Sequence, residues 1–152
     1  MSDDLRSSIK RLGRIVEVRH TYTTVAEAAF REAEGHVNRL IQADAEMERQ
    51  IQAVRAEIAH SQGMTGRDVQ GNEKYIEGLE FKRRKILQSI EKAKSFVEEK
   101  RTEWVERLRD ERVIEKVQER RLHEWEREEE LLKQKAMDDA FIGRFVRTHL
   151  TR

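Results

Sequence analysis

The amino-acid sequence predicts an all-α fold, a two-helix antiparallel coiled-coil hairpin in which the second helix is longer and overhangs at the C-terminus. Three observations predict it: a composition typical of long helices, an apolar seam along two segments, and a cluster of glycines between them. Of the 152 residues, 40% are charged, 6% are aromatic and none is proline. This composition fits helices that bury only a narrow stripe. Disorder is the alternative for so polar a chain, and the apolar periodicity argues against it.

The first segment has apolar residues at alternating spacings of four and three. The positions are Leu5, Ile9, Leu12, Val16, Arg19, Thr23, Ala26, Phe30, Ala33, Val37, Leu40, Asp44, Met47, Ile51, Val54 and Ile58. All but Arg19, Thr23 and Asp44 are apolar. A repeat of this kind produces the seam of a left-handed coiled coil. We therefore expect a first helix from about residue 3 to residue 60.

The pattern stops in residues 61–72, which contain Gly63, Gly66 and Gly71. Glycine permits positive φ and weakens a helix interior. We expect a turn across this whole stretch. Asn72 would cap the helix that follows, because asparagine is a favoured N-cap residue.

The second segment resumes the seam and predicts a helix over about residues 73–148. Its positions are Ile76, Leu79, Arg83, Ile86, Ile90, Ala93, Val97, Lys100 and Trp104. Folding the segments back on each other pairs Ile58 with Ile76 and Phe30 with Trp104, and the same register carried onward pairs Leu12 with Leu122. The whole chain would form a single coiled-coil domain, residues 1–152, with 130–152 as an unpaired overhang.

Polar residues interrupt the seam mainly where Arg19–Ala26 would face Arg107–Glu115. Two interpretations are open. Long Arg and Lys stems can cover a seam while their charged ends reach water, or the section can be a soft part of the coiled coil.

Several classes of function are disfavoured by composition. The net charge is +1 and the charges are mixed, so we expect no nucleic-acid partner; the basic run Lys82–Lys85 has glutamates on both sides. Cysteine is absent, the five histidines share no metal-ligand spacing, and no phosphate-binding loop is present. We expect no enzyme activity, no catalytic residue, no metal and no cofactor. No membrane span or signal segment is evident, which indicates a cytoplasmic protein.

The overhang is the strongest indication of a binding function. Its apolar residues are Leu131, Leu132, Met137, Phe141, Ile142, Phe145 and Val146. No acidic residue follows Asp139, whereas Arg144, Arg147 and Arg152 do. Exposed apolar surface usually marks an interaction site, so we expect a partner there.

Two stretches resemble the central-stalk proteins of bacterial type III secretion, the flagellar FliJ family and its virulence-system relatives of the YscO type. One is RLGRIVEVR at residues 11–19, followed by spaced alanines. The other is residues 128–145, where Gln134 and Lys135 precede Asp138 and Asp139. The resemblance does not separate the flagellar from the virulence branch, and we favour the flagellar one because it is commoner.

The resemblance implies a stalk, monomeric in isolation, that joins two partners. The end with both termini would enter a hexameric export ATPase, and the hairpin tip would contact the cytoplasmic domain of the membrane-embedded export gate; export chaperones are further partners. The chain would then lie at the inner membrane only through its partners. The implied ATPase-contact residues are Leu5, Ile9, Leu12, Arg14, Trp125, Leu132, Gln134, Met137, Asp138, Asp139, Phe141 and Phe145. The implied gate-contact residues are Ile58, Met64, Val69 and Tyr75.

A second hypothesis is a generic coiled-coil scaffold or a holdase chaperone that binds unfolded clients along its seam. Two such molecules could also pair through their overhangs. Sedimentation distinguishes the hypotheses, because a stalk should be an elongated monomer.

Overall fold

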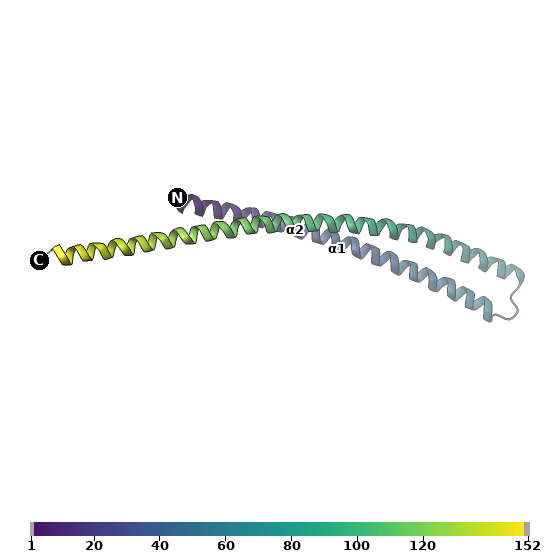
Figure 1. Ribbon diagram of the computed structural model, residues 1–152. Coiled ribbons are helices and arrows are strands. Elements are labelled where there is room, and N and C mark those ends of the chain that lie inside the picture. The colour runs from purple at the N-terminus through teal and green to yellow at the C-terminus, as the bar shows by residue number, and fades with distance from the viewer. Residues whose placement is uncertain (1, 151–152) are drawn as a thin grey trace. The chain divides into compact units, whose positions relative to one another are not determined.

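The computed structural model of the chain describes residues 2–150 and consists, over that range, of two long helices (Figure 1). Helix α1 spans Ser2–His60 and helix α2 spans Gly66–Leu150. The two helices pack against each other in opposite directions, and the described residues form no strand. The predicted fold class, an all-α two-helix hairpin, is confirmed.

The contacts of the chain fall into two compact units, and both helices contribute to each. The tip unit is Val25–Val105, and it contains the turn. The terminal unit comprises the described residues of Met1–Thr24 and Glu106–Arg152. The seam predicted for α1 is confirmed in both units, because none of its sixteen positions is exposed.

The turn is shorter than the sequence suggested. Helix α2 begins at Gly66 rather than at residue 73, so the prediction of a turn through residue 72 is wrong. Thr65 and Asp68 explain the early start: the Asp68 N–H donates to the Thr65 hydroxyl oxygen at 3.2 Å, and the Thr65 N–H donates to the Asp68 carboxylate at 3.2 Å. This reciprocal arrangement is a capping box.

Two of the three glycines thus lie in helix α2, and only one serves the turn itself. Gly63 has a φ of +86°, which side chains other than glycine rarely tolerate. Asn72 is not the N-cap. It lies inside α2, and its side-chain amide donates to the Met64 sulfur at 3.7 Å.

The tip unit contains the apolar core. Its buried hydrophobic residues are Phe30, Ala33, Val37, Ile51, Ile76, Leu79, Ile90 and Ala93. Near the turn, Ile51, Ile76 and Leu79 form a buried cluster against which Met47, Val54 and Ile58 pack. Further along, the Phe30 and Trp104 rings stack with centroids 5.4 Å apart. This stack confirms the predicted pairing of Phe30 with Trp104.

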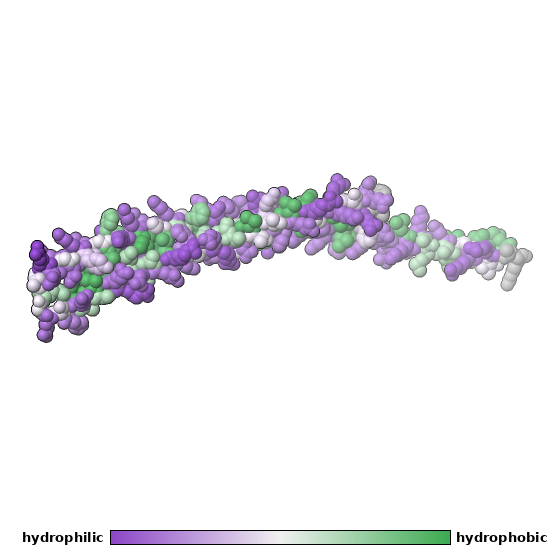
Figure 2. All heavy atoms as spheres, turned by 180° about the vertical axis from the view of Figure 1, so that it is seen from behind, coloured by the Kyte–Doolittle hydropathy of each residue, from purple (hydrophilic) through white to green (hydrophobic). Residues whose placement is uncertain are grey.

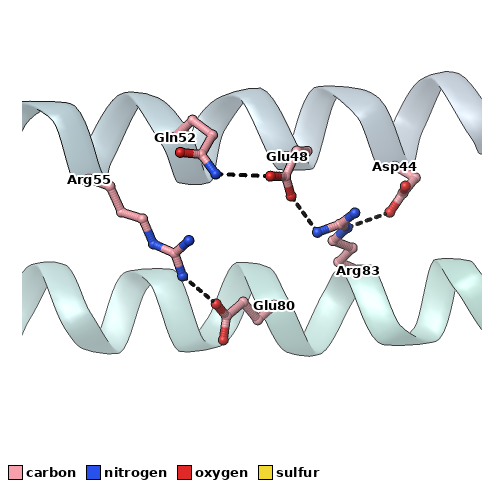
Figure 3. A network of polar contacts seen from close by, with 6 residues as sticks. All are labelled: Asp44, Glu48, Gln52, Arg55, Glu80 and Arg83. Atoms are coloured by element: carbon pink, nitrogen blue, oxygen red, sulfur yellow. Dashed lines mark hydrogen bonds and ion pairs between the residues drawn. The ribbon is translucent and has the colours of Figure 1, made fainter.

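The tip unit also has a polar layer in its seam, formed by Arg83 of α2 with two acids of α1 (Figure 3). The Arg83 Nε donates to Asp44 at 2.9 Å, and another of its guanidinium nitrogens donates to Glu48. The Asp44 side chain is only 19% exposed. The charged end of Arg83 thus pairs with acids across the seam instead of reaching water.

The terminal unit is packed differently. Its buried residues within the described range are Thr23 and Glu111, both polar, and its apolar seam residues are half-buried. The helices nevertheless touch, since the Thr23 hydroxyl lies 3.3 Å from the Arg107 carbonyl oxygen, to which it donates. The polar section predicted around Arg19–Ala26 is therefore present, and it includes the centre of this unit's seam.

In the terminal unit, the predicted pairing of Leu12 with Leu122 is not supported. Gly13 lies beside Gln118: a Cβ atom added to Gly13 would be 3.3 Å from the side-chain nitrogen of Gln118. His20 contacts Glu111. Leu122, the predicted partner of Leu12, is 42% exposed. After Trp104, the positions of α2 that are not exposed include Leu108, Glu111, Ile114, Gln118 and Trp125.

We predict that Phe30→Ala lowers the free energy of unfolding by about 3 kcal/mol, because it removes a buried ring and the stacking contact of that ring with Trp104. Urea unfolding followed by circular dichroism measures this. Phe81→Ala is the matched control: Phe81 is 52% exposed, so its loss should cost less than about 1 kcal/mol. Equal losses for the two variants would contradict the assigned core.

We also predict that Arg83→Ala shifts the urea midpoint downward more than Arg55→Ala does. Removing Arg83 leaves the half-buried Asp44 without its partner, and an unpaired acid in a seam is destabilising. Arg55 pairs with Glu80 at 3.0 Å, but its side chain is 52% exposed, where ion pairs contribute little. A larger effect at Arg55 would contradict the role assigned to the polar layer.

Candidate functional site

The most distinctive surface belongs to the terminal unit, where α2 continues past the N-terminal end of α1 (Figure 1). We call residues 130–150 the extension. Every residue in this range is exposed except Gly143, which is intermediate. The predicted overhang therefore has, over its described length, no cover from α1.

Large apolar side chains are exposed along the extension, and Figure 2 shows them as green atoms among purple ones at the right-hand end of that view. Their exposed fractions range from 42% for Val146 to 77% for Leu150. The set is Leu131, Leu132, Met137, Phe141, Ile142, Phe145, Val146 and Leu150. The segment contains no proline that would interrupt the helix.

The predicted ATPase-contact residues all lie in the terminal unit, but they differ in accessibility. Leu5, Ile9, Leu12 and Trp125 are half-buried seam residues. The indole N–H of Trp125 has no hydrogen-bond partner among the described residues. The remaining residues of this set are exposed, namely Arg14, Leu132, Gln134, Met137, Asp138, Asp139, Phe141 and Phe145. The exposed group forms the accessible part of the site.

A second apolar stripe on α1 was missed by the sequence reasoning. Ile15, Val18 and Tyr22 are 42%, 51% and 49% exposed and follow one another at spacings of three and four. Each lies one residue before a predicted seam position, and this spacing is the sequence signal that could have identified the stripe. The Arg107 guanidinium lies over the Tyr22 ring, 5.3 Å from its centroid, so the stripe has a basic border from α2.

A polar layer lies beside this stripe, in the seam of the terminal unit. Glu111 is 6% exposed, and one of its oxygens lies 2.7 Å from Nδ1 of His20. The Thr23 hydroxyl and the His20 ring lower the pKa of the Glu111 carboxyl below its ordinary value of 4.5, although burial acts in the opposite direction. Its other oxygen has no hydrogen-bond partner among the described residues. A buried acid of this kind makes the packing of this unit depend on its ionised state.

The predicted gate-contact residues all lie at the turn end of the tip unit. Tyr75 is 53% exposed, while Met64 and Val69 are half-buried. Ile58 packs against the buried cluster of the tip unit, so it acts mainly in the core. The surface at the turn is a polar depression, lined by Ser61, Gln62, Gly63, Met64, Arg67, Asp68, Gly71 and Asn72.

Residues 2–150 lack the features of two other classes of function. No group of three or more histidine or acidic side chains in this range is placed to hold a metal ion. Neither of the two helices, over the same residues, contains a stretch long and apolar enough to span a bilayer.

The fold and the site define a class of protein: a two-helix coiled-coil hairpin that presents exposed apolar side chains at the end carrying both termini. The profile of the Flagellar FliJ protein family matches residues 8–149. The chain belongs to this family, whose members are non-catalytic components associated with flagellar and type III export. Searches of curated proteins and of solved structures returned no match.

We predict that stability falls as the pH decreases below about 4.5, and that Glu111→Gln weakens this dependence. Because the folded-state pKa of Glu111 is lowered, its stabilising contribution is full above the ordinary pKa and is lost as pH falls through the folded value. Urea midpoints between about pH 7 and about pH 3 measure the effect. Glu119→Gln, at an exposed position, should keep the wild-type dependence; the same dependence in both variants would contradict the prediction.

Proposed function

We propose that this chain is a non-enzymatic stalk of a type III export apparatus, namely the flagellar one, and that it acts in the cytoplasm. Its terminal unit enters the central pore of a hexameric export ATPase, and its turn contacts the cytoplasmic domain of the export gate. Family membership supports the export role. The identity of the partners and the end of the molecule that enters the ATPase go beyond what family membership supports.

The single observation that carries the ATPase assignment is the extension. A helix of about 10 Å diameter with side chains is narrow enough to enter a protein ring, and the extension offers eight large apolar side chains without intramolecular cover. Exposed surface of this kind marks interaction sites. Lys133 and Lys135 lie between these residues and are followed by Asp138 and Asp139, and such a mixed-charge surface suits a contact that can be remade in several orientations.

The gate assignment is supported by the tip unit. Its cluster of Ile51, Ile76 and Leu79 anchors both helices directly behind the turn, so the turn is held on a rigid base. The capping box of Thr65 and Asp68 fixes the start of α2 there. Tyr75 then provides an exposed aromatic ring for a partner.

We predict that the full chain raises the rate of ATP hydrolysis, or promotes hexamer formation, of the export ATPase from the same organism, and that deletion of residues 137–152 removes most of this stimulation. The physical reason is the loss of the apolar contacts of Met137, Phe141 and Phe145. Steady-state hydrolysis and sedimentation of the ATPase measure it. Val113→Ser, at a 60% exposed position outside the predicted set, is the matched control.

Tyr75→Ser separates the two ends of the molecule. It should weaken binding to the isolated cytoplasmic domain of the export gate and leave ATPase stimulation unchanged. Unchanged ATPase stimulation after the deletion would overturn the assignment of the terminal end. Binding of unfolded proteins together with no effect on the ATPase would favour the alternative, a generic scaffold or holdase chaperone.

A further inference from the structure

The last three turns of α2 have two chemically distinct faces. Six side chains of residues 141–150 form one face: Phe141, Ile142, Phe145, Val146, His149 and Leu150. At about 100° per residue, these positions cover roughly half of the helix circumference. Arg144, Arg147, Gly143 and Thr148 occupy the other half. We call the first half the apolar face.

The apolar face is exposed and internally ordered. Phe141, Ile142, Phe145 and Leu150 are 70%, 57%, 53% and 77% exposed. The His149 ring stacks on Phe145 with centroids 4.0 Å apart, and its Nδ1 lies 2.9 Å from the Phe145 carbonyl oxygen. The imidazole thus adds to the aromatic surface of the face.

The charge of this segment differs from that of the rest of the chain. From residue 140 onward there are three arginines and no acid, although the whole chain carries a net charge of only +1. The Arg147 Nε donates to the Gly143 carbonyl oxygen at 3.4 Å. This hydrogen bond keeps the side chain on the face opposite the aromatic rings. Asp138 and Asp139, one turn earlier, bound the basic segment on its N-terminal side.

A short helix with aromatic and aliphatic residues on one face and arginines on the other has the features of an interfacial membrane anchor. Its apolar face inserts at the boundary of headgroups and acyl chains, and arginine side chains reach the phosphates by extending along their stems. The absence of acids after Asp139 removes the repulsion that an anionic surface would otherwise meet.

We propose that residues 141–150 bind the surface of an anionic phospholipid bilayer, with the apolar face in the interface and Arg144 and Arg147 on the phosphates. This goes beyond the stalk function, which places the chain at the membrane only through proteins. Phe141 and Phe145 are also proposed contacts of the ATPase. Lipid and ATPase therefore compete for the apolar face, and the free chain is the form that binds the bilayer.

The experiment is co-flotation of the purified full-length chain with vesicles, in the absence of any other protein. Vesicles of phosphatidylcholine alone are compared with vesicles containing about 30% phosphatidylglycerol, at about 0.1 M and about 0.5 M salt. We expect about tenfold more chain on the anionic vesicles at the lower salt concentration, and most of this excess should be lost at the higher one.

Two double variants separate the apolar and electrostatic contributions. Phe141→Ser with Phe145→Ser should abolish flotation with both vesicle types. Arg144→Gln with Arg147→Gln should remove the preference for anionic vesicles only. Leu131→Ser, at a 64% exposed position of the acidic part of the extension, is the matched control and should float like the wild type. Circular dichroism verifies that all four proteins keep their helix content.

Three results would overturn the proposal. One is no enrichment of the wild type on anionic vesicles. Another is equal flotation of the wild type and the double serine variant. The third is a stable dimer in sedimentation, dissociated by the same serine variant and without flotation, which would mean that a second copy covers the apolar face. None of these results depends on the ATPase, so failure here leaves the stalk function standing, and loss of ATPase stimulation leaves this proposal standing.

Discussion

The structure depends on one seam, the stripe of apolar side chains through which α1 and α2 pack in the tip unit. A single helix of this composition would be held by little more than propensity and local ion pairs, which contribute a few tenths of a kcal/mol each. The seam adds cooperative burial: Ile51 is 2% exposed and Leu79 is 5% exposed. The direction of α2 and the register of Phe30 against Trp104 follow from it.

The seam is not uniform, and the difference separates the two units. The tip unit buries eight apolar residues, whereas the buried residues of the terminal unit, within the described range, are Thr23 and Glu111. Dispersion and hydrophobic burial therefore stabilise the tip unit, while the terminal unit relies more on hydrogen bonds such as that between His20 and Glu111. Weakly buried units open at lower free energy. In the proposed function, the unit that enters the partner is therefore the more adaptable of the two.

Polar residues in the seam have a second consequence, which is specificity. Arg83 can be satisfied only where Asp44 and Glu48 of α1 face it. A slip of one heptad would leave these charges unpaired, and unpaired charges in a seam are costly. The polar layer thus selects one register among several that the apolar stripe alone would permit. The extension shows the converse, because it has no facing helix and its surface is available to partners.

The sequence by itself determined the class of fold and most of the seam. A period of 3.5 residues held from Leu5 to Ile58 leaves few alternatives to a coiled coil, and the extension was evident because the predicted register places it beyond the residues of the second helix that face the first. The length of the turn was overestimated, because the prediction relied on the number of glycines and overlooked Thr65 and Asp68. The reciprocal hydrogen bonds of these two residues start the helix at Gly66. Only the tertiary structure decided the contact of His20 with Glu111 and the exposure of Leu122 and of Ile15, Val18 and Tyr22. These features depend on how the side chains of α1 and α2 meet across the seam, and the apolar pattern of α2 is too weak after Trp104 to determine this from the sequence.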